Sequence, residues 1–120
     1  MRKIYLFSLL LVCMALFSQA QDYSNYSSLG NRAQQLVKTY PSLVKLSSLT
    51  KTDGGKDIWM LTIGTGNAAQ KPAVAVVGGV EGAHLLGVEL AIGFAEELLA
   101  KSNTDSIKNL LNKQTFYVFP

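Results

Sequence analysis

The stretch that decides the fold is residues 73–100, which read AVAVVGGVEGAHLLGVELAIGFAEELLA. It opens with five apolar residues, Ala73–Val77, which suit a buried strand, and continues through a glycine-rich turn that begins at Gly78 and Gly79. From His84 onward the apolar residues recur at helical spacing and leave only a narrow stripe of glutamates. We therefore expect a largely buried helix, and the order of strand, turn and helix predicts half of a βαβ unit in an α/β fold.

The turn of this stretch carries two side chains of the kind that bind metals, Glu81 and His84. Chemistry in α/β sheets gathers at the carboxyl ends of the strands, which is where these two residues fall. The dipole of the following helix favours an anionic Glu81 and a neutral His84, a pair that zinc accepts as ligands. From the spacing alone, a solvated carboxylate and a capping histidine are the favoured interpretation of this pair.

Five other residues of interest have ordinary structural interpretations. Glu89 is expected to be a solvated or capping carboxylate rather than a partner of a metal ligand, and Glu96 and Glu97 to form an exposed helix stripe. Lys56 is expected to be a solvated turn residue, and Trp59 a core aromatic.

The rest of the chain supplies more strands and helices of ordinary length. In chain order we expect a helix over residues 22–39, strands over 43–49 and 58–63 joined by a turn at 53–56, and a short helix over 107–111. A strand over Thr115–Phe119 follows, rich in residues that favour β-structure. We expect this last strand to form an unpaired apolar edge of the sheet, which would leave the chain with little stability of its own.

Two segments resemble the zinc carboxypeptidases of the carboxypeptidase A type (the M14 peptidases). KPAVAVVGGVEGAHLLGVEL, residues 71–90, is similar to the region of the first zinc motif, and YPSLVKLSSLTKTDGGKDIWMLTIG, residues 40–64, to the start of the catalytic domain. The family motif is His-x-x-Glu after a strand that ends in Gly-Gly. Here the two ligand types stand in reversed order, with Glu81 where the family has histidine and His84 where it has glutamate.

This resemblance implies a fold and a cofactor. The fold would be a partial three-layer α/β/α carboxypeptidase-like fold with a mixed sheet, truncated after the strand that ends at Pro120. Residues 21–120 would be the N-terminal part of a zinc carboxypeptidase-like catalytic domain that acts on a peptide or protein substrate. Zinc would be bound partly through Glu81 and His84.

The same resemblance implies that much of the chemistry lies elsewhere. In the family the third zinc ligand is a later histidine, and the general base and the substrate-binding residues also come later in the chain. His84 is the one histidine here, so no catalytic residue is assigned and the substrate-binding residues remain unknown. We expect the chain to be an N-terminal fragment that is inactive alone, even if its parent is a metallocarboxypeptidase.

Residues 1–20 have the organisation of a secretory signal peptide. Arg2 and Lys3 precede an apolar run over residues 4–17, and Ser18-Gln19-Ala20 forms a small-x-small cleavage site. An uncleaved anchor is the runner-up, disfavoured by the short apolar run. Cys13 lies inside the apolar run rather than at its end, which disfavours a lipoprotein. The predicted location is secreted or periplasmic, with no membrane contact after cleavage.

Composition excludes one class of partner. The sequence holds 11 basic and 8 acidic residues, and removal of the signal peptide leaves 9 basic residues and a net charge near +1. The basic character therefore belongs mostly to the targeting signal, and no nucleic acid partner is expected. The oligomeric state is not indicated by the sequence.

Three functions stay open at this point. The first is a secreted zinc carboxypeptidase of which this chain is the N-terminal part. The second is a relative whose reversed pair has lost zinc and which acts as an exported binding or scaffold domain. The third is a small exported α/β interaction module that is complete at 120 residues.

Overall fold

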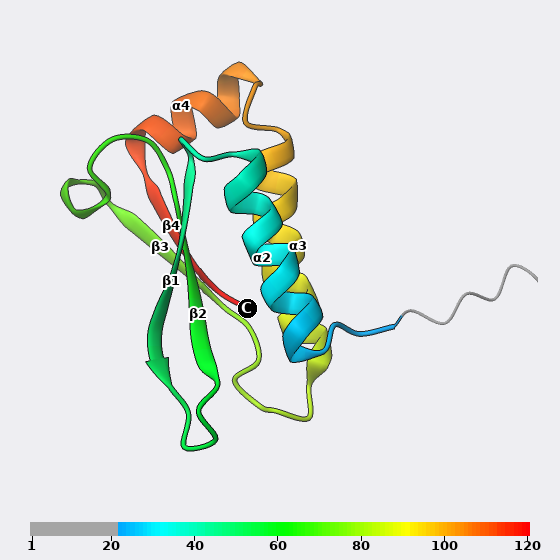
Figure 1. Cartoon of the computed structure of the whole chain (residues 1–120). Coiled ribbons are helices and arrows are strands. Elements are labelled where there is room, and N and C mark those ends of the chain that lie inside the picture. The colour runs from blue at the N-terminus through cyan, green and yellow to red at the C-terminus, as the bar shows by residue number, and fades with distance from the viewer. Residues whose placement is uncertain (1–21) are drawn as a thin grey trace, which may run out of the picture.

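A computed structural model describes residues 22–120, so the predicted signal peptide and Gln21 lie outside the described residues. Its centre is a four-stranded sheet in the order β1-β2-β4-β3 (Figure 1). The strands are β1 Val44–Lys51, β2 Asp57–Ile63, β3 Ala73–Val77 and β4 Thr115–Phe119. β2 pairs antiparallel with both β1 and β4, whereas β3 and β4 are parallel. The predicted α/β fold with a mixed sheet is confirmed.

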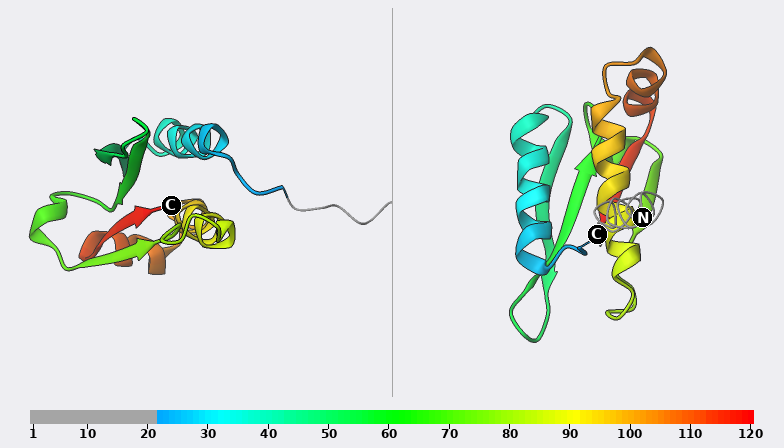
Figure 2. Two further views of the ribbon diagram at one scale, coloured as in Figure 1. Left: turned by 90° about the horizontal axis from the view of Figure 1, so that it is seen from below. Right: turned by 90° about the vertical axis from the view of Figure 1, so that its right-hand side faces the viewer.

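In residues 22–120, three α-helices accompany the sheet. They are α2 Tyr26–Thr39, α3 Leu85–Ala100 and α4 Asp105–Lys113, and a single 3-10 turn, Ala68–Gln70, lies in the loop before β3. The ribbon in Figure 2 shows α2 and α3 side by side on the same face of the sheet. Between residues 22 and 120, no helix combines the length and apolar character needed to span a bilayer.

The core fills the space between this helix pair and the sheet. Strand positions that are opposite one another in the ladders, such as Val44 and Ile63, direct their side chains to the same face and are buried there. α3 contributes its small and branched residues to this core, which lets the helix approach the sheet closely. The buried apolar residues are Leu29, Ala33, Leu36, Val44, Leu61, Ile63, Ala91, Ile92, Ala95, Leu98, Leu99, Leu111, Phe116 and Val118.

The predicted edge position of the last strand is wrong. β4 is a central strand that pairs with β2 on one side and with β3 on the other, and Phe116 and Val118 are buried. The connection through α3 and α4 brings β4 beside β3 in a parallel orientation. The β1–β2 hairpin lies on the other side of β4, where β2 pairs with it antiparallel. β3 is therefore an edge strand in the part of the chain that the structure describes.

The prediction that α3 is largely buried is also wrong for residues 22–120. One side of α3 is fully in the core, but Leu86, Leu90 and Phe94 are 57%, 65% and 37% exposed. These residues lie four apart and so share one flank of the helix. The sheet ends at β3, so no further strand lies under this flank in the described structure.

Candidate functional site

The turn between β3 and α3 is held close to the helix by glycines. A Cβ atom on Gly78 would lie 2.4 Å from the carbonyl oxygen of Gly87 and 2.9 Å from the Cβ of Ala91. Gly79 has φ of +61°, a conformation that other residues rarely adopt. Gly82 has open space around it and no positive φ, so the predicted need for glycine is confirmed at Gly78 and Gly79 only.

Glu81 and His84 contact each other at the carboxyl end of β3. The His84 Nδ1 atom lies 2.9 Å from Glu81 Oε2, and the His84 backbone N–H donates to the Glu81 carbonyl, also at 2.9 Å. Both side chains are largely exposed, 75% for His84 and 71% for Glu81. The turn therefore brings a carboxylate and an imidazole together at the surface, where a third group can reach them.

His84 occupies the N-cap position of α3, which begins at Leu85. Its side chain makes no capping hydrogen bond, so the prediction of a capping histidine is wrong. No acidic residue lies in the first turn of α3, so no side chain of that turn offsets the positive end of the helix dipole. This end of the helix follows the turn that carries Glu81.

Glu81 and His84 are of the types that zinc accepts as ligands, but they are only two. The two side chains contact each other directly at 2.9 Å and do not point at a shared third position. Within residues 22–120, no group of three or more histidine, cysteine, aspartate or glutamate side chains is placed to hold a metal ion. The described residues therefore place one carboxylate and one imidazole together but no complete metal site.

Glu89 belongs to an ion-pair cluster with Arg32. The prediction that Glu89 is a solvated or capping carboxylate is therefore wrong. The guanidinium of Arg32 on α2 binds Glu89 at 2.6 Å and Glu96 at 2.7 Å, and it also donates to the Ser24 hydroxyl at 2.8 Å. The Ser24 backbone N–H donates to the other Glu89 oxygen at 2.5 Å. Arg32 therefore ties the segment before α2, the helix α2 itself and the helix α3 together.

Glu96 and Glu97 differ in their surroundings. The predicted exposed stripe holds for Glu97, which pairs with Lys101 one helical turn later at the surface. Glu96 instead receives two hydrogen bonds from Arg32. The sequence carried no signal for these contacts, because Arg32 lies 64 residues before Glu96.

The Glu89 carboxylate should make stability depend on pH. Hydrogen bonds from Ser24, and then those from Arg32, hold the pKa of Glu89 at about 2, below its ordinary value of 4.5. A lowered folded-state pKa contributes stability that is present above the unfolded pKa and is lost as the pH falls toward the folded value. We expect the stability advantage of wild type over Glu89→Gln to shrink between pH 4.5 and 2. Urea unfolding at several pH values measures it, and an advantage equal at pH 2 and pH 7 would contradict the assignment.

An apolar groove of about 620 Å³ adjoins the turn on the side of the β1–β2 hairpin. Tyr26 and Trp59 stack there with ring centroids 6.4 Å apart, and the ammonium of Lys56 lies 5.4 Å from the centre of the Tyr26 ring. Lys56 is thus in contact with an aromatic face rather than simply solvated. Trp59 is half-buried, in keeping with its predicted packing role.

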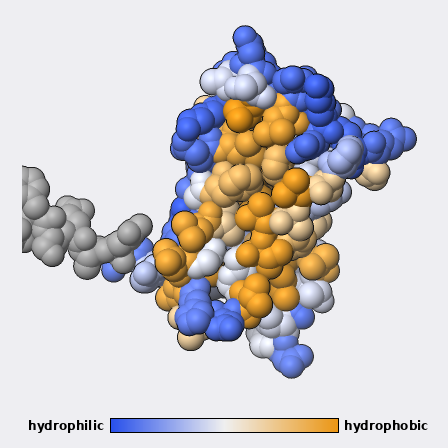
Figure 3. All heavy atoms as spheres, turned by 180° about the vertical axis from the view of Figure 1, so that it is seen from behind, coloured by the Kyte–Doolittle hydropathy of each residue, from blue (hydrophilic) through white to orange (hydrophobic). Residues whose placement is uncertain are grey.

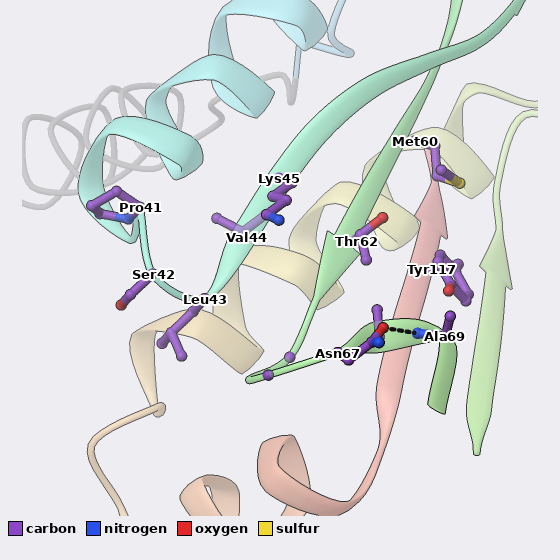
Figure 4. Close-up of a pocket in the computed structure, with 13 residues that line it drawn as sticks. Pro41, Ser42, Leu43, Val44, Lys45, Met60, Thr62, Asn67, Ala69 and Tyr117 are labelled. Atoms are coloured by element: carbon purple, nitrogen blue, oxygen red, sulfur yellow. Dashed lines mark hydrogen bonds between the residues drawn. The ribbon is translucent and has the colours of Figure 1, made fainter. Parts of the chain in front are cut away.

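A second hollow, of about 780 Å³, lies on the face of the sheet opposite α2 and α3 (Figure 4). Lys45, Met60, Thr62 and Tyr117 line it from three strands, and the loop before β3 curls over it. Asn67 stabilises that loop by accepting a hydrogen bond from the Ala69 N–H at 3.1 Å. The hollow contains neither Glu81 nor His84 and is separate from the β3–α3 turn.

A sequence profile of the zinc carboxypeptidases (peptidase M14) matches residues 30–120, which include both sheet and turn. The chain belongs to this family. Among curated zinc carboxypeptidase relatives, it is 28% identical over 101 residues to the zinc carboxypeptidase of Saccharothrix mutabilis subsp. capreolus. It is 25% identical over 99 residues to mouse carboxypeptidase A6. Each alignment covers 82% of this chain and 23% of the relative, so the chain spans about a quarter of their length.

Solved structures share the fold of this chain. Thrombin-activatable fibrinolysis inhibitor superposes with a TM-score of 0.72 at 15% identity, covering 82% of this chain and 25% of that one. Carboxypeptidase A from Helicoverpa armigera gives a TM-score of 0.72 at 20% identity, covering 99% of this chain and 31% of that one. The resemblance stated from the two sequence segments is thereby confirmed, and the fold is a partial carboxypeptidase A-like fold.

Proposed function

We propose that this chain supplies the first part of the catalytic domain of an exported zinc metallocarboxypeptidase, which hydrolyses peptide bonds. The observation that carries the proposal is the exposed Glu81–His84 pair at the carboxyl end of β3, in a chain of the zinc carboxypeptidase family. The coverage of about a quarter of each relative supports a contribution to a larger domain rather than the whole of it.

In this proposal Glu81 and His84 are the two zinc ligands that the chain provides. When bound, zinc polarises a peptide carbonyl and lowers the pKa of a water molecule. The role of this chain is to hold the two donors on one short turn. Gly78 and Gly79 allow that turn to lie against α3. To bind a metal, Glu81 and His84 must turn from each other toward a shared third point, which their exposure permits.

A zinc titration of the purified chain tests the ligand pair without relying on catalysis. His84 is the one histidine, so its imidazole signals in an NMR spectrum need no assignment by mutation. We expect added Zn²⁺ to shift those signals with weak affinity, since two protein ligands hold zinc less firmly than three. Glu81→Gln should weaken binding by about tenfold or more, a loss of about 1.4 kcal/mol.

The control is Glu97→Gln, which removes an exposed carboxylate that is paired with Lys101 near the other end of α3. It should leave the zinc response of His84 unchanged. If the imidazole signals fail to respond to Zn²⁺, or if the two glutamate variants weaken the response equally, the ligand assignment is wrong.

A second candidate is a zinc-free member of the family that acts as an exported binding or scaffold domain. The observation that favours it is the direct 2.9 Å contact between His84 Nδ1 and Glu81 Oε2. In this contact the two side chains are polar partners for each other, and no metal is needed. A His84 signal that responds to pH but not to Zn²⁺ would support this candidate over the first.

Export is proposed from residues 1–20 alone, which lie outside the described structure. We expect a secreting host to cleave the chain after Ala20 and release a product that begins at Gln21. Intact mass and N-terminal sequencing of the released protein measure this. A product that keeps residues 1–20 and stays with the membrane would contradict it.

A further inference from the structure

The turn between β1 and β2 contains an aspartate that is followed directly by a glycine. Residues 51–56 read KTDGGK, and Asp53-Gly54 is the one Asp-Gly pair of the sequence. All residues of this segment are exposed. Figure 1 shows the turn projecting beyond the sheet, and Figure 3 shows polar surface where it projects at the lower end of the molecule. Asp53 and the backbone beside it are therefore open to water.

The hydrogen bonds of the turn leave the reactive groups of this pair free. The Thr52 N–H donates to the Lys56 carbonyl at 2.8 Å, and the Lys56 N–H donates to the Thr52 hydroxyl at 3.2 Å. The Gly55 N–H donates to the Thr52 carbonyl at 2.8 Å. In the described part of the chain, no hydrogen bond or ion pair engages the Gly54 N–H or the Asp53 carboxylate. Neither group has to give up a partner for the two to come together.

The aspartates of β2 and α4 are held differently. Asp57 pairs with Lys51 at 3.1 Å, and the residue after it, Ile58, lies in the β1–β2 ladder and carries a branched side chain. Asp105 begins α4, so the residue that follows it is fixed in helical geometry. A reaction between a carboxyl group and the next backbone nitrogen needs the chain between them to rotate. Of these three aspartates, Asp53 alone has that freedom, because a glycine in a turn follows it.

We propose that Asp53 is a site of spontaneous isomerisation to isoaspartate, which the open β1–β2 turn permits in the folded chain. The Gly54 nitrogen attacks the Asp53 Cγ atom and forms an N–Cγ bond, while a Cγ–O bond breaks. The amide proton and the carboxyl OH leave together as water, and a succinimide ring remains. The reacting groups are neighbours in one chain, so the step is intramolecular and favoured by proximity.

Water then opens the succinimide at either of its carbonyl carbons. Addition at Cγ breaks the new N–Cγ bond and restores aspartate. Addition at the main-chain carbonyl carbon breaks the original peptide bond and leaves the chain connected through Cγ, which is isoaspartate. The first step releases a water molecule and the second takes one up, so no atoms are gained or lost overall. No oxidant, reductant or cofactor takes part.

An isoaspartate lengthens the backbone of the turn by one atom, because the chain then runs through Cβ and Cγ. The hydrogen bond that the Thr52 carbonyl accepts spans this point. Beyond it, the Lys56 ammonium lies 5.4 Å from the centre of the Tyr26 ring. We expect both contacts to be weakened, whereas the pairing of residues 44–48 with β2 lies farther from the turn and should stay. This inference is independent of zinc and of the proposed function.

The test is an incubation of the purified chain at neutral pH and body temperature over several weeks, in buffer and in guanidinium chloride. Trypsin then isolates Asp53 in the peptide of residues 52–56, and fragmentation by electron transfer distinguishes isoaspartate from aspartate. In buffer, we expect isoaspartate to form several-fold faster at Asp53 than at Asp57 or Asp105. The rate at Asp53 should differ by less than about tenfold between the two solutions, because the folded turn holds neither reacting group. Circular dichroism of the same samples reports that the chain in buffer is folded.

Three substitutions test the chemistry. Asp53→Asn should react several-fold faster than wild type, because the nitrogen attacks a neutral amide more readily than an ionised carboxylate, and ammonia then leaves in place of water. Asp53→Glu should stop the reaction, because its longer side chain would have to close a larger ring. Gly54→Ala should slow it several-fold by hindering the nitrogen. The alanine fits the turn, since a Cβ atom there would lie 3.8 Å from the Thr52 hydroxyl oxygen and Gly54 has no positive φ.

The matched control is Asp57→Asn, which places an asparagine in the same hairpin but within β2. In buffer it should lose ammonia much more slowly than Asp53→Asn, and guanidinium chloride should speed it by a larger factor. Isoaspartate at Asp53 that forms only in guanidinium chloride would overturn the inference, and so would equal rates in wild type and Gly54→Ala. Equal rates for the two asparagine variants in buffer would also overturn it.

Discussion

Replacing Gly78 with alanine should lower the free energy of unfolding by about 3 kcal/mol, the upper part of the range for overpacking a close contact. The new methyl group would lie 2.4 Å from the Gly87 carbonyl oxygen, and Ala91 Cβ, at 2.9 Å, blocks the adjacent space. Both neighbours belong to α3, so relief requires the helix to move away from β3. For a domain of this size, such a loss lowers the melting temperature by roughly 12 °C or more.

The matched control is Gly93→Ala in the same helix. A Cβ atom at Gly93 meets no atom within 4 Å, so the substitution should raise stability by about 0.5–1 kcal/mol through the better helix propensity of alanine. Thermal and urea unfolding followed by circular dichroism, all at one protein concentration, compare the two variants with wild type. Equal stability of Gly78→Ala and wild type would show that the close approach of turn and helix is not required.

Removing Arg32 is the second change with a large expected effect. Arg32→Met should lower the free energy of unfolding by about 2 kcal/mol, less than the loss for a fully buried pair because the cluster is partly exposed. The substitution leaves the Glu89 and Glu96 carboxylates near each other without a cation, and it frees Ser24 from the guanidinium. These two glutamates also raise the pKa of Arg32, Glu96 contributing most, so the guanidinium stays charged.

Two further variants separate the cluster from a general surface effect. Adding Glu89→Gln and Glu96→Gln to Arg32→Met removes the unpaired negative charges and should recover most of the lost stability. Lys101→Met breaks the exposed pair with Glu97 and should cost less than about 0.5 kcal/mol. If Arg32→Met is no more destabilising than Lys101→Met in urea unfolding, Arg32 does not join α2 to α3 as the geometry indicates.

The sequence by itself determined what depends on neighbouring residues. The run of five apolar residues before Gly78 predicted β3, and the helical spacing after His84 predicted α3. The polar turn at residues 53–56 predicted the hairpin of β1 and β2. The Gly-Gly turn with Glu81 and His84 indicated the family, because these motifs are short and lie within one stretch of chain. Each of these signals arises from contacts a few residues apart.

Only the tertiary structure decided which of these elements meet. β4 lies between β2 and β3, and these pairings join strands far apart in the sequence, which no local pattern encodes. Arg32 binds Glu89, which lies 57 residues later in the chain. Nothing in the sequence around Arg32 distinguishes it from an arginine that is exposed and unpaired. The apolar flank of α3 was predicted to be buried because its composition is that of a buried helix. Burial, however, requires a neighbouring layer, and the residues from 22 to 120 place the core on the other side of α3.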